Sequence, residues 1–227
     1  MADGVSNMAI KQFLIPLALA AGVVALARPA LAERTLLAPP PALSLAPTAT
    51  REVAIFAGGC FWGVEGVFEH VRGVSSAVSG YTGGTAARPS YEVVSSGASG
   101  HAEAVRVTYD PRVVRYTDLL RIYFSVVADP TQLNRQGPDR GTQYRTALFP
   151  TSAAQERQAR AYIAQLRTQR IFDRPIVTRI ESLRGFTPAE IYHQDYMRKN
   201  PNAGYIVAND RPKVEALKRL FPKSYRG

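Results

Sequence analysis

The sequence contains few of the residues that bind metals or form cross-links, and this scarcity excludes several classes of protein. Among 227 residues there is one cysteine, Cys60, and there are three histidines, His70, His101 and His193. A single cysteine rules out an intramolecular disulfide and a cysteine-rich metal cluster. Three histidines far apart in the chain make a multi-histidine metal site a poor hypothesis. We therefore expect neither a metal ion nor a cofactor.

Long runs of like charge are also missing, although the chain is basic. It carries 28 Lys and Arg against 18 Asp and Glu, a formal net charge of +10, but no five Lys or Arg are consecutive. Dispersed positive charge favours a solvated surface over a nucleic-acid interface. A composition with 46% hydrophobic and 20% charged residues is typical of a globular domain with a sizeable core. We expect a monomer without a nucleic-acid partner.

The N-terminal region predicts export. In residues 1–32, Lys11 precedes an apolar run over 13–27, and Ala30-Leu31-Ala32 has the small-residue pattern of a cleavage site. An arginine and a proline end the run short of the roughly 20 apolar residues that a membrane span needs. This length disfavours the alternative of an uncleaved anchor. We expect cleavage after Ala32 and a periplasmic location.

Residues 33–50 are rich in Pro and Ala, with Pro39-Pro40-Pro41 at their centre. This composition predicts an extended linker rather than a packed element. Residues 51–227 are then expected to form the folded domain.

The most informative stretch runs from Val53 to Phe68. It predicts an apolar strand, a glycine pair and a helix with apolar residues at the i, i+3, i+4, i+7 spacing, and Cys60 lies where that helix begins. The unpaired N–H groups and positive dipole end of a helix lower a thiol pKa from about 8.5 toward or below neutrality. A free thiol in an oxidising compartment is also of little use unless it reacts. We therefore predict a reactive thiolate at Cys60, rather than a buried inert cysteine.

The two residues after Cys60 have different predicted roles. Phe61 continues the buried stripe three residues before Val64, so we predict that it belongs to the core. Trp62, the single tryptophan, lies off that stripe. We predict that its indole lines a pocket beside the sulfur.

The best candidate for an acid is Glu103. Residues 101–109 alternate, and Glu103 shares one face with Val105, Val107 and Tyr109. A carboxyl on an apolar face is either paired or has a raised pKa, and the sequence leaves both hypotheses open. Weaker candidates lie in polar loops: Tyr91, Asp139 and Tyr144. Asp139 and Tyr144 belong to the polar stretch 129–144, and loops of that length are usually functional or disordered.

The remaining segments predict an α+β fold. Strands are expected over 74–81, 101–109, 146–149 and 176–180, and residues 85–100 are expected to be loop. Helices are expected from a cap at Thr117, from a capping box at Ser152, from a second capping box at Thr187-Pro188-Ala189-Glu190, and over 212–220. The order strand–helix–strand–strand–helix–strand predicts a ferredoxin-like α/β sandwich core with additional helices and long loops.

Several linked motifs resemble one family. Gly59-Cys60-Phe61-Trp62-Gly63-Val64-Glu65 resembles the signature of the A type of peptide methionine sulfoxide reductases. Matching motifs follow in order to about residue 205: Gly80–Gly84, Tyr91–Val94, Gly100–Val107, Asp129–Thr131, Asn134–Asp139, Gly141–Arg145, Tyr192–Gln194 and Lys199–Pro201. The resemblance implies reduction of the S epimer of methionine sulfoxide, free or in proteins, by a catalytic domain at 51–227.

The resemblance also implies a role for each candidate residue. Cys60 would be the nucleophile and Glu103 the acid, because a sulfoxide sulfur becomes attackable when its oxygen is protonated. Phe61 and Trp62 would hold the substrate methyl group. The oxygen-binding side would be completed by the three polar-loop residues: Tyr91, Asp139 and Tyr144.

The chain departs from many relatives in two ways. Ala128 replaces a histidine before Asp129-Pro130-Thr131, and no downstream cysteine is present to resolve a Cys60 sulfenic acid. We therefore expect direct reduction by a thioredoxin-like or other external thiol of the export compartment. Two other hypotheses remain: a Cys–His acyl hydrolase that uses His101 or His193, and a basic peripheral binding domain with a buried cysteine.

Overall fold

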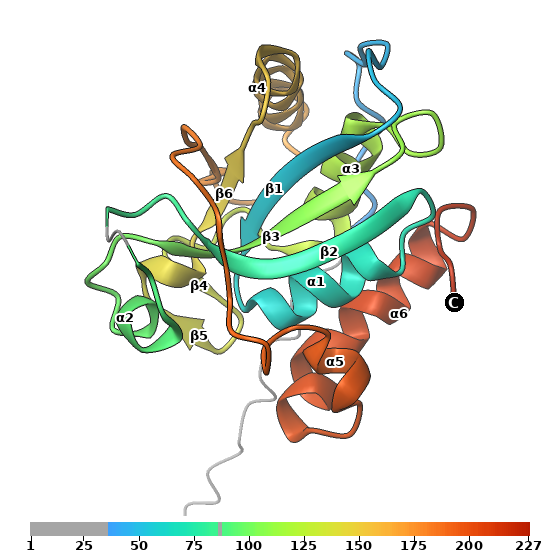
Figure 1. The fold of residues 1–227 in the computed structure, drawn as a ribbon. Coiled ribbons are helices and arrows are strands. Elements are labelled where there is room, and N and C mark those ends of the chain that lie inside the picture. The colour runs from blue at the N-terminus through green and yellow to red at the C-terminus, as the bar shows by residue number, and fades with distance from the viewer. Residues whose placement is uncertain (1–35, 86–87) are drawn as a thin grey trace, which may run out of the picture.

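The computed structural model describes residues 36–85 and 88–227, so the predicted export signal at 1–32 lies outside the described residues. The elements follow one another in this order (Figure 1): β1 (Glu52–Gly58), α1 (Phe61–Glu69), β2 (Val74–Thr82), α2 (Tyr91–Ser95), β3 (Ala102–Tyr109), α3 (Tyr116–Ile122), the π-helix η1 (Tyr123–Val127), β4 (Arg135–Gln136), β5 (Asp139–Arg140), the 3₁₀-helix η2 (Thr142–Tyr144), β6 (Thr146–Phe149), α4 (Ala153–Thr168), β7 (Arg179–Ile180), β8 (Thr187–Pro188), α5 (Tyr196–Lys199), the π-helix η3 (Ile206–Asp210) and α6 (Arg211–Leu220).

The main sheet has six strands in the order β7-β6-β1-β3-β2-β8. All neighbouring pairs are antiparallel except β6 and β7, which are parallel. If the four central strands are numbered by their order in the chain, β6, β1, β3 and β2 lie across the sheet in the order 4-1-3-2. Helix α1 connects the strands numbered 1 and 2, which are β1 and β2. This is the ferredoxin-like arrangement, and the predicted α+β class is confirmed.

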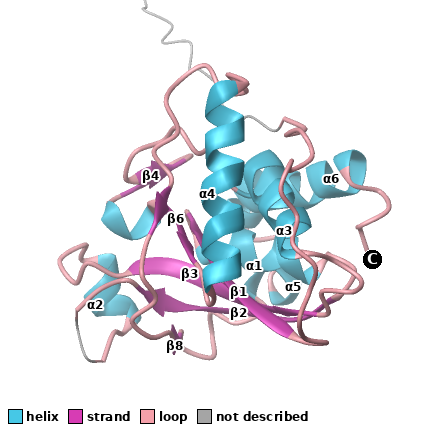
Figure 2. Ribbon diagram, turned by 90° about the horizontal axis from the view of Figure 1, so that it is seen from above, coloured by secondary structure: helices cyan, strands magenta, loops and turns pink. Residues whose placement is uncertain are grey.

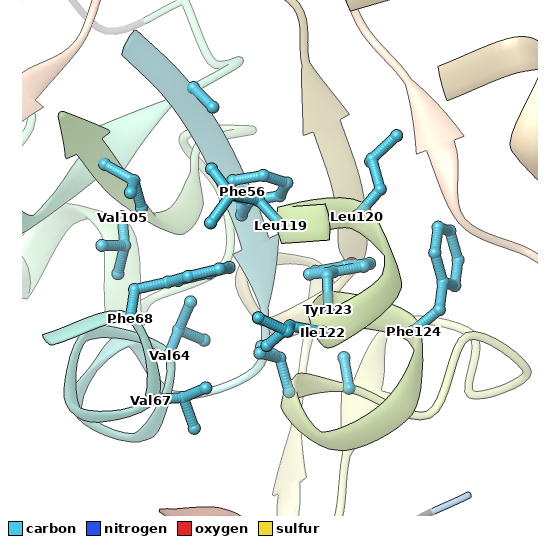
Figure 3. Packing of buried hydrophobic residues seen from close by; sticks show 14 of the residues in the cluster. Phe56, Val64, Val67, Phe68, Val105, Leu119, Leu120, Ile122, Tyr123 and Phe124 are labelled. Atoms are coloured by element: carbon cyan, nitrogen blue, oxygen red, sulfur yellow. The ribbon is translucent and has the colours of Figure 1, made fainter. Parts of the chain in front are cut away.

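The two faces of the sheet differ in how they are covered. Helical residues pack on one face (Figure 3). There the Phe56 ring stacks on the Phe68 ring, at 4.8 Å between ring centroids, and also on the Tyr123 ring. The opposite face carries a smaller cluster, which includes Ala104. Val105 and Val107 belong to the larger core. Because successive side chains of a strand alternate, Glu103 also faces the helices.

Strand register brings the ends of β1 and β3 together. Phe56 pairs with Val105 in the antiparallel ladder, and Glu103 lies two residues before Val105. The chain leaves β1 at Gly58 and enters α1 at Phe61, so Cys60 lies at the same end of the sheet. This end also holds α2 and the β4–β5 hairpin, whereas α6 and the C-terminus lie at the other end (Figures 1 and 2).

The prediction of a helix that begins at Thr187-Pro188 is wrong. These two residues form β8, the edge strand that pairs with Gly80 and Tyr81 of β2. Proline is tolerated at an edge, where its missing N–H costs no ladder hydrogen bond. Glu190 does not cap a helix, because its carboxylate accepts hydrogen bonds from the Tyr81 hydroxyl and the Tyr91 amide, each at 2.8 Å.

Two other helix predictions need correction. Residues 85–100 were expected to be loop, but Ser90 accepts a hydrogen bond from the Val93 amide and caps the short helix α2. Thr117 does not cap α3. It lies inside that helix with its hydroxyl 3.1 Å from that of Ser44, and Asp118 instead accepts the hydrogen bond from the Arg115 amide.

Helix α4 begins where it was predicted, with Ser152 accepting the Gln155 amide. The predicted strand over 176–180 is shorter, because only Arg179 and Ile180 pair with β6. The polar stretch 129–144 is also more ordered than predicted. It contains the β4–β5 hairpin and a 3₁₀ turn that ends at Tyr144.

The Pro- and Ala-rich segment is extended, as predicted, but the expectation that it does not pack is wrong for residues 36–45. Ala38 is fully buried, and its amide donates to the Ser125 hydroxyl at 3.0 Å. The Tyr162 hydroxyl donates to the Pro39 carbonyl at 2.7 Å, and Gln165 accepts the Ala42 amide at 2.8 Å. These contacts attach the segment to η1 and α4. Polar side chains on the two helices explain the packing, because they satisfy backbone groups that a proline-rich segment cannot pair internally.

We predict that Ala38→Asp destabilises the folded chain. A carboxylate at this fully buried position loses its hydration, and the neighbouring Arg121 guanidinium is already bound to the Ala38 carbonyl at 2.8 Å, so we expect a cost of about 2–4 kcal/mol of unfolding free energy. Urea denaturation measures this as a lower midpoint. Ala42→Asp is the matched control, because Ala42 belongs to the same segment but is exposed. If Ala38→Asp lost no more unfolding free energy than Ala42→Asp, the segment would not be packed at Ala38 in solution.

Candidate active site

Cys60 lies immediately before the first turn of α1 and is 9% exposed. The preceding Gly59 has φ +90°, and a Cβ atom there would lie 2.6 Å from the Gln136 side chain, so this position requires glycine. Gln136 itself is tied to Asp129, since it accepts that residue's amide at 3.0 Å and donates to its carbonyl at 2.7 Å. The cysteine turn therefore rests on the folded 129–144 loop.

The thiol of Cys60 does not have the lowered pKa that the helix start predicts. Burial raises its pKa well above the ordinary value, and the carboxyl groups of Glu103, Asp210 and Asp139 raise it further. The hydrogen bond from the Trp62 amide acts in the opposite direction but is weaker. Cys60 is therefore a thiol at neutral pH.

Glu103 is hydrogen-bonded to the residue that follows Cys60. It is 2% exposed, and its Oε2 accepts the Phe61 amide at 3.0 Å, one of the unpaired N–H groups at the start of α1. Burial raises the pKa of Glu103 to about 8. The hydrogen bond from Phe61 lowers this pKa, whereas the charges of Asp139 and Asp210 raise it. Both hypotheses for this carboxyl hold in part, because it binds the Phe61 amide and also has a raised pKa, at which it is mostly protonated at neutral pH.

Aromatic rings cover the side of the site next to Cys60. Phe61 is 1% exposed and belongs to the core, as its place on the stripe predicts. Trp62 is only partly buried, as its position off the stripe predicts. Its indole stacks on Tyr196 at 3.7 Å between ring centroids, donates to His193 Nδ1 at 3.1 Å and meets Tyr205 edge-on.

The structure brings the three polar-loop candidates to the same place. Tyr91 begins α2, and its ring lies 4.5 Å from that of His193. Asp139 lies in β5, and Tyr144 ends η2. Burial is the main cause that raises the pKa of Tyr91 and of Tyr144, and the charge of Glu103 is the second cause. Cys60 and Asp139 also raise both pKa values. The predicted residues thus form one electrostatic cluster.

Sequence reasoning missed two members of this cluster. Tyr205 donates a hydrogen bond to Asp139, and Asp210 is 1% exposed and raises the pKa of both Cys60 and Glu103. Tyr205 directly precedes the π-helix η3 and Asp210 is its last residue, and π-helices are rare elements that often occur at functional sites. Asp210 precedes Arg211-Pro212, where the sequence suggests no more than an ordinary helix start.

The two histidines do not support an acyl hydrolase. His193 Nδ1 accepts from Trp62, and its buried Nε2 has no hydrogen-bond partner among the described residues, so neither nitrogen activates Cys60. The His101 ring lies against Gly84, and its Nδ1 is likewise unpaired within residues 36–85 and 88–227. A cysteine that faces a protonated carboxyl, rather than a histidine, is suited to chemistry that needs a proton donor opposite a nucleophile.

Comparison with known proteins identifies the family. The family model described as peptide methionine sulfoxide reductase matches residues 52–225, and the chain belongs to this family of oxidoreductases, which reduce methionine sulfoxide and repair oxidised proteins. Its curated relatives place it in the A type. Peptide methionine sulfoxide reductase MsrA 2 of Mesorhizobium japonicum is 58% identical over 174 residues, which cover 77% of this chain and 89% of the relative. MsrA of Deinococcus radiodurans is 52% identical over 180 residues, with 79% and 87% covered.

Solved structures agree with this assignment. The reduced form of Mxr1 from Saccharomyces cerevisiae is similar with a TM-score of 0.62 and 33% identity, covering 70% of this chain and 91% of that one. Methionine sulfoxide reductase A of Corynebacterium diphtheriae has a TM-score of 0.58 and 31% identity, with 69% and 78% covered. The fold is therefore that of the A-type reductases.

Proposed function

We propose that this chain reduces the S epimer of methionine sulfoxide, free or in proteins, with Cys60 as the nucleophile and Glu103 as the acid. One observation carries the proposal: a buried carboxyl with a pKa raised to about 8 accepts the amide of Phe61, the residue next to the only cysteine. The carboxyl is therefore protonated where a sulfoxide oxygen needs a proton.

The surrounding residues support binding of the sulfoxide in one orientation. The hydroxyls of Tyr91 and Tyr144, with raised pKa values, stay protonated and can donate to the sulfoxide oxygen as its charge develops. Asp139 binds the Tyr205 hydroxyl at the same side. The partly buried Trp62 ring offers an apolar surface to the methyl group and sulfur, and the Phe61 ring, 1% exposed, supports the same site from the core.

The proposed reaction transfers one oxygen atom between two sulfurs. The Cys60 sulfur attacks the sulfoxide sulfur while Glu103 protonates the oxygen, and the thiol proton restores the carboxyl. The hydroxyl then moves to the Cys60 sulfur as its bond to the substrate sulfur and the new sulfur–sulfur bond both break, which leaves a sulfenic acid on Cys60 and releases the methionine thioether. Because the thiol pKa is raised, the cysteine loses its proton during the attack rather than before it.

We propose that an external thiol completes the cycle. One thiol condenses with the sulfenic acid, which releases water and forms a mixed disulfide, and a second thiol frees Cys60 and leaves as a disulfide. The absence of a second cysteine in the 227 residues supports this route. A thioredoxin-like protein is the proposed donor. The signal predicted at 1–32 supports action in the periplasm, and we propose that the enzyme acts there as a monomer.

The proposal predicts discrimination between the two epimers. With dithiothreitol as reductant, we expect steady turnover of the S epimer and no measurable turnover of the R epimer, because only one configuration directs the oxygen to Glu103 while the sulfur faces Cys60. Each purified epimer is assayed separately by methionine release. Equal rates on both epimers, or activity on the R epimer alone, would contradict the proposal.

A further inference from the structure

Glu65 is a buried carboxyl of the cysteine motif to which neither the sequence nor the proposed chemistry gives a role. It lies on α1, three residues after Trp62 and one turn from it, and is 1% exposed. Its oxygens accept two backbone amides from different segments: Oε1 accepts Ser79 of β2 at 3.3 Å, and Oε2 accepts Asp195 at 3.0 Å. A buried carboxyl that binds backbone amides in this way holds segments together.

Asp195 is the more informative partner. It has φ +55°, a left-handed conformation that is uncommon for a residue other than glycine, and it directly precedes α5. The hydrogen bond that the Asp195 amide donates to Glu65 therefore supports a backbone conformation that the sequence alone disfavours. Gln194 strengthens the same attachment, because its side-chain oxygen accepts the Ser79 amide at 3.0 Å and its nitrogen donates to the Ser79 carbonyl at 2.9 Å.

This segment carries two of the three rings that contact Trp62. Tyr196, directly after Asp195, stacks on the indole with 9° between the ring planes, and His193, two residues before it, accepts the indole N–H. The α5 turn lies beside α1 (Figure 1), and a Cβ atom at Gly66 would meet the Met197 side chain at 2.5 Å. A shift of Asp195 therefore moves the rings that hold Trp62.

We propose that Glu65 is a positioning residue, which fixes the Trp62 indole for substrate binding by holding Asp195 in its left-handed conformation. The inference rests on the proposed role of Trp62 in binding the sulfoxide methyl group. Burial, followed by the charge of Glu69, raises the pKa of Glu65 to about 8, against the two amide hydrogen bonds. The protonated side chain has nearly the shape of glutamine, which can still accept the Asp195 amide.

Glu65→Leu and Glu65→Gln test the proposal in the full-length protein. For Glu65→Leu we expect KM for the S epimer to rise about tenfold with kcat changed much less, since binding is lost while the reacting groups stay in place. For Glu65→Gln we expect KM near that of the wild type. Gln158→Leu is the matched control: it removes a buried acceptor on α4, which binds the Leu45 amide at 2.9 Å, and we expect stability to fall with KM unchanged.

Fluorescence gives a readout that a merely structural role would not change, because Trp62 is the only tryptophan. We expect Glu65→Leu to shift its emission and increase quenching by acrylamide, whereas Gln158→Leu does neither. A folded Glu65→Leu variant with wild-type emission would overturn the inference, whatever its activity. Trp62→Phe tests separately whether Trp62 binds the substrate. An unchanged KM in that variant would contradict substrate binding by Trp62. The emission of Glu65→Leu would then decide whether Glu65 positions the indole.

Discussion

Cys60→Ser is expected to reduce turnover of the S epimer to the rate of the reductant alone, a loss of at least about 10⁴-fold. A serine hydroxyl is a far weaker nucleophile and forms no sulfenic acid, so both halves of the proposed cycle fail. Methionine release with dithiothreitol measures the loss. Because serine differs from cysteine by one atom at a site that is 9% exposed, we expect the fold and the Trp62 emission to be retained.

The same residue also tests the reduction half. In the wild-type protein, an excess of sulfoxide without a thiol should give one methionine per chain and a Cys60 sulfenic acid, which reacts with sulfenic-acid probes such as dimedone. Turnover should then stop until a thiol is added, because the sequence offers no second cysteine. More than one methionine per chain in the absence of any thiol would contradict the scheme.

Glu103→Gln is expected to lower the rate of the first turnover by about 10²–10⁴-fold, the range for loss of a positioned acid. The amide oxygen can still accept the Phe61 amide, so the start of α1 should keep its geometry. What is lost is the proton for the sulfoxide oxygen. Single-turnover methionine release under saturating substrate measures the chemical step apart from reduction by thiols.

The pH profile distinguishes an acid from a structural carboxyl. The pKa of Glu103 is raised to about 8, so the proton is present below that pH and is lost as pH rises through it. We expect the first-turnover rate of the wild type to fall above about pH 8 and that of Glu103→Gln to show no such fall. A wild-type rate that rises through this range would show that the proton on Glu103 is not required.

Local patterns were sufficient to predict the main parts of the site. The period-2 alternation of β3 placed Glu103 on the face of Val105, and the glycine pair before an apolar stripe placed Cys60 at the start of a helix. Both features depend on neighbours in the chain, and the structure has both. The helix prediction at Thr187-Pro188 is wrong for the opposite reason, because contacts with distant residues decide the structure there. Its capping pattern is locally sound, but pairing with β2 and the use of Glu190 by Tyr81 outweigh it.

The sequence by itself determined the family motifs, the core strands and the choice of Cys60 and Glu103 as the proposed thiol and acid, because each depends on side-chain type and short-range spacing. Only the tertiary structure decided the ionisation of Cys60. The helix start lowers a thiol pKa, but burial and three carboxyl groups from distant segments raise it further than the helix can lower it. Only the fold brought Tyr205 to Asp139 and set Glu65 against Asp195, 130 residues away, because such contacts depend on how separate elements pack.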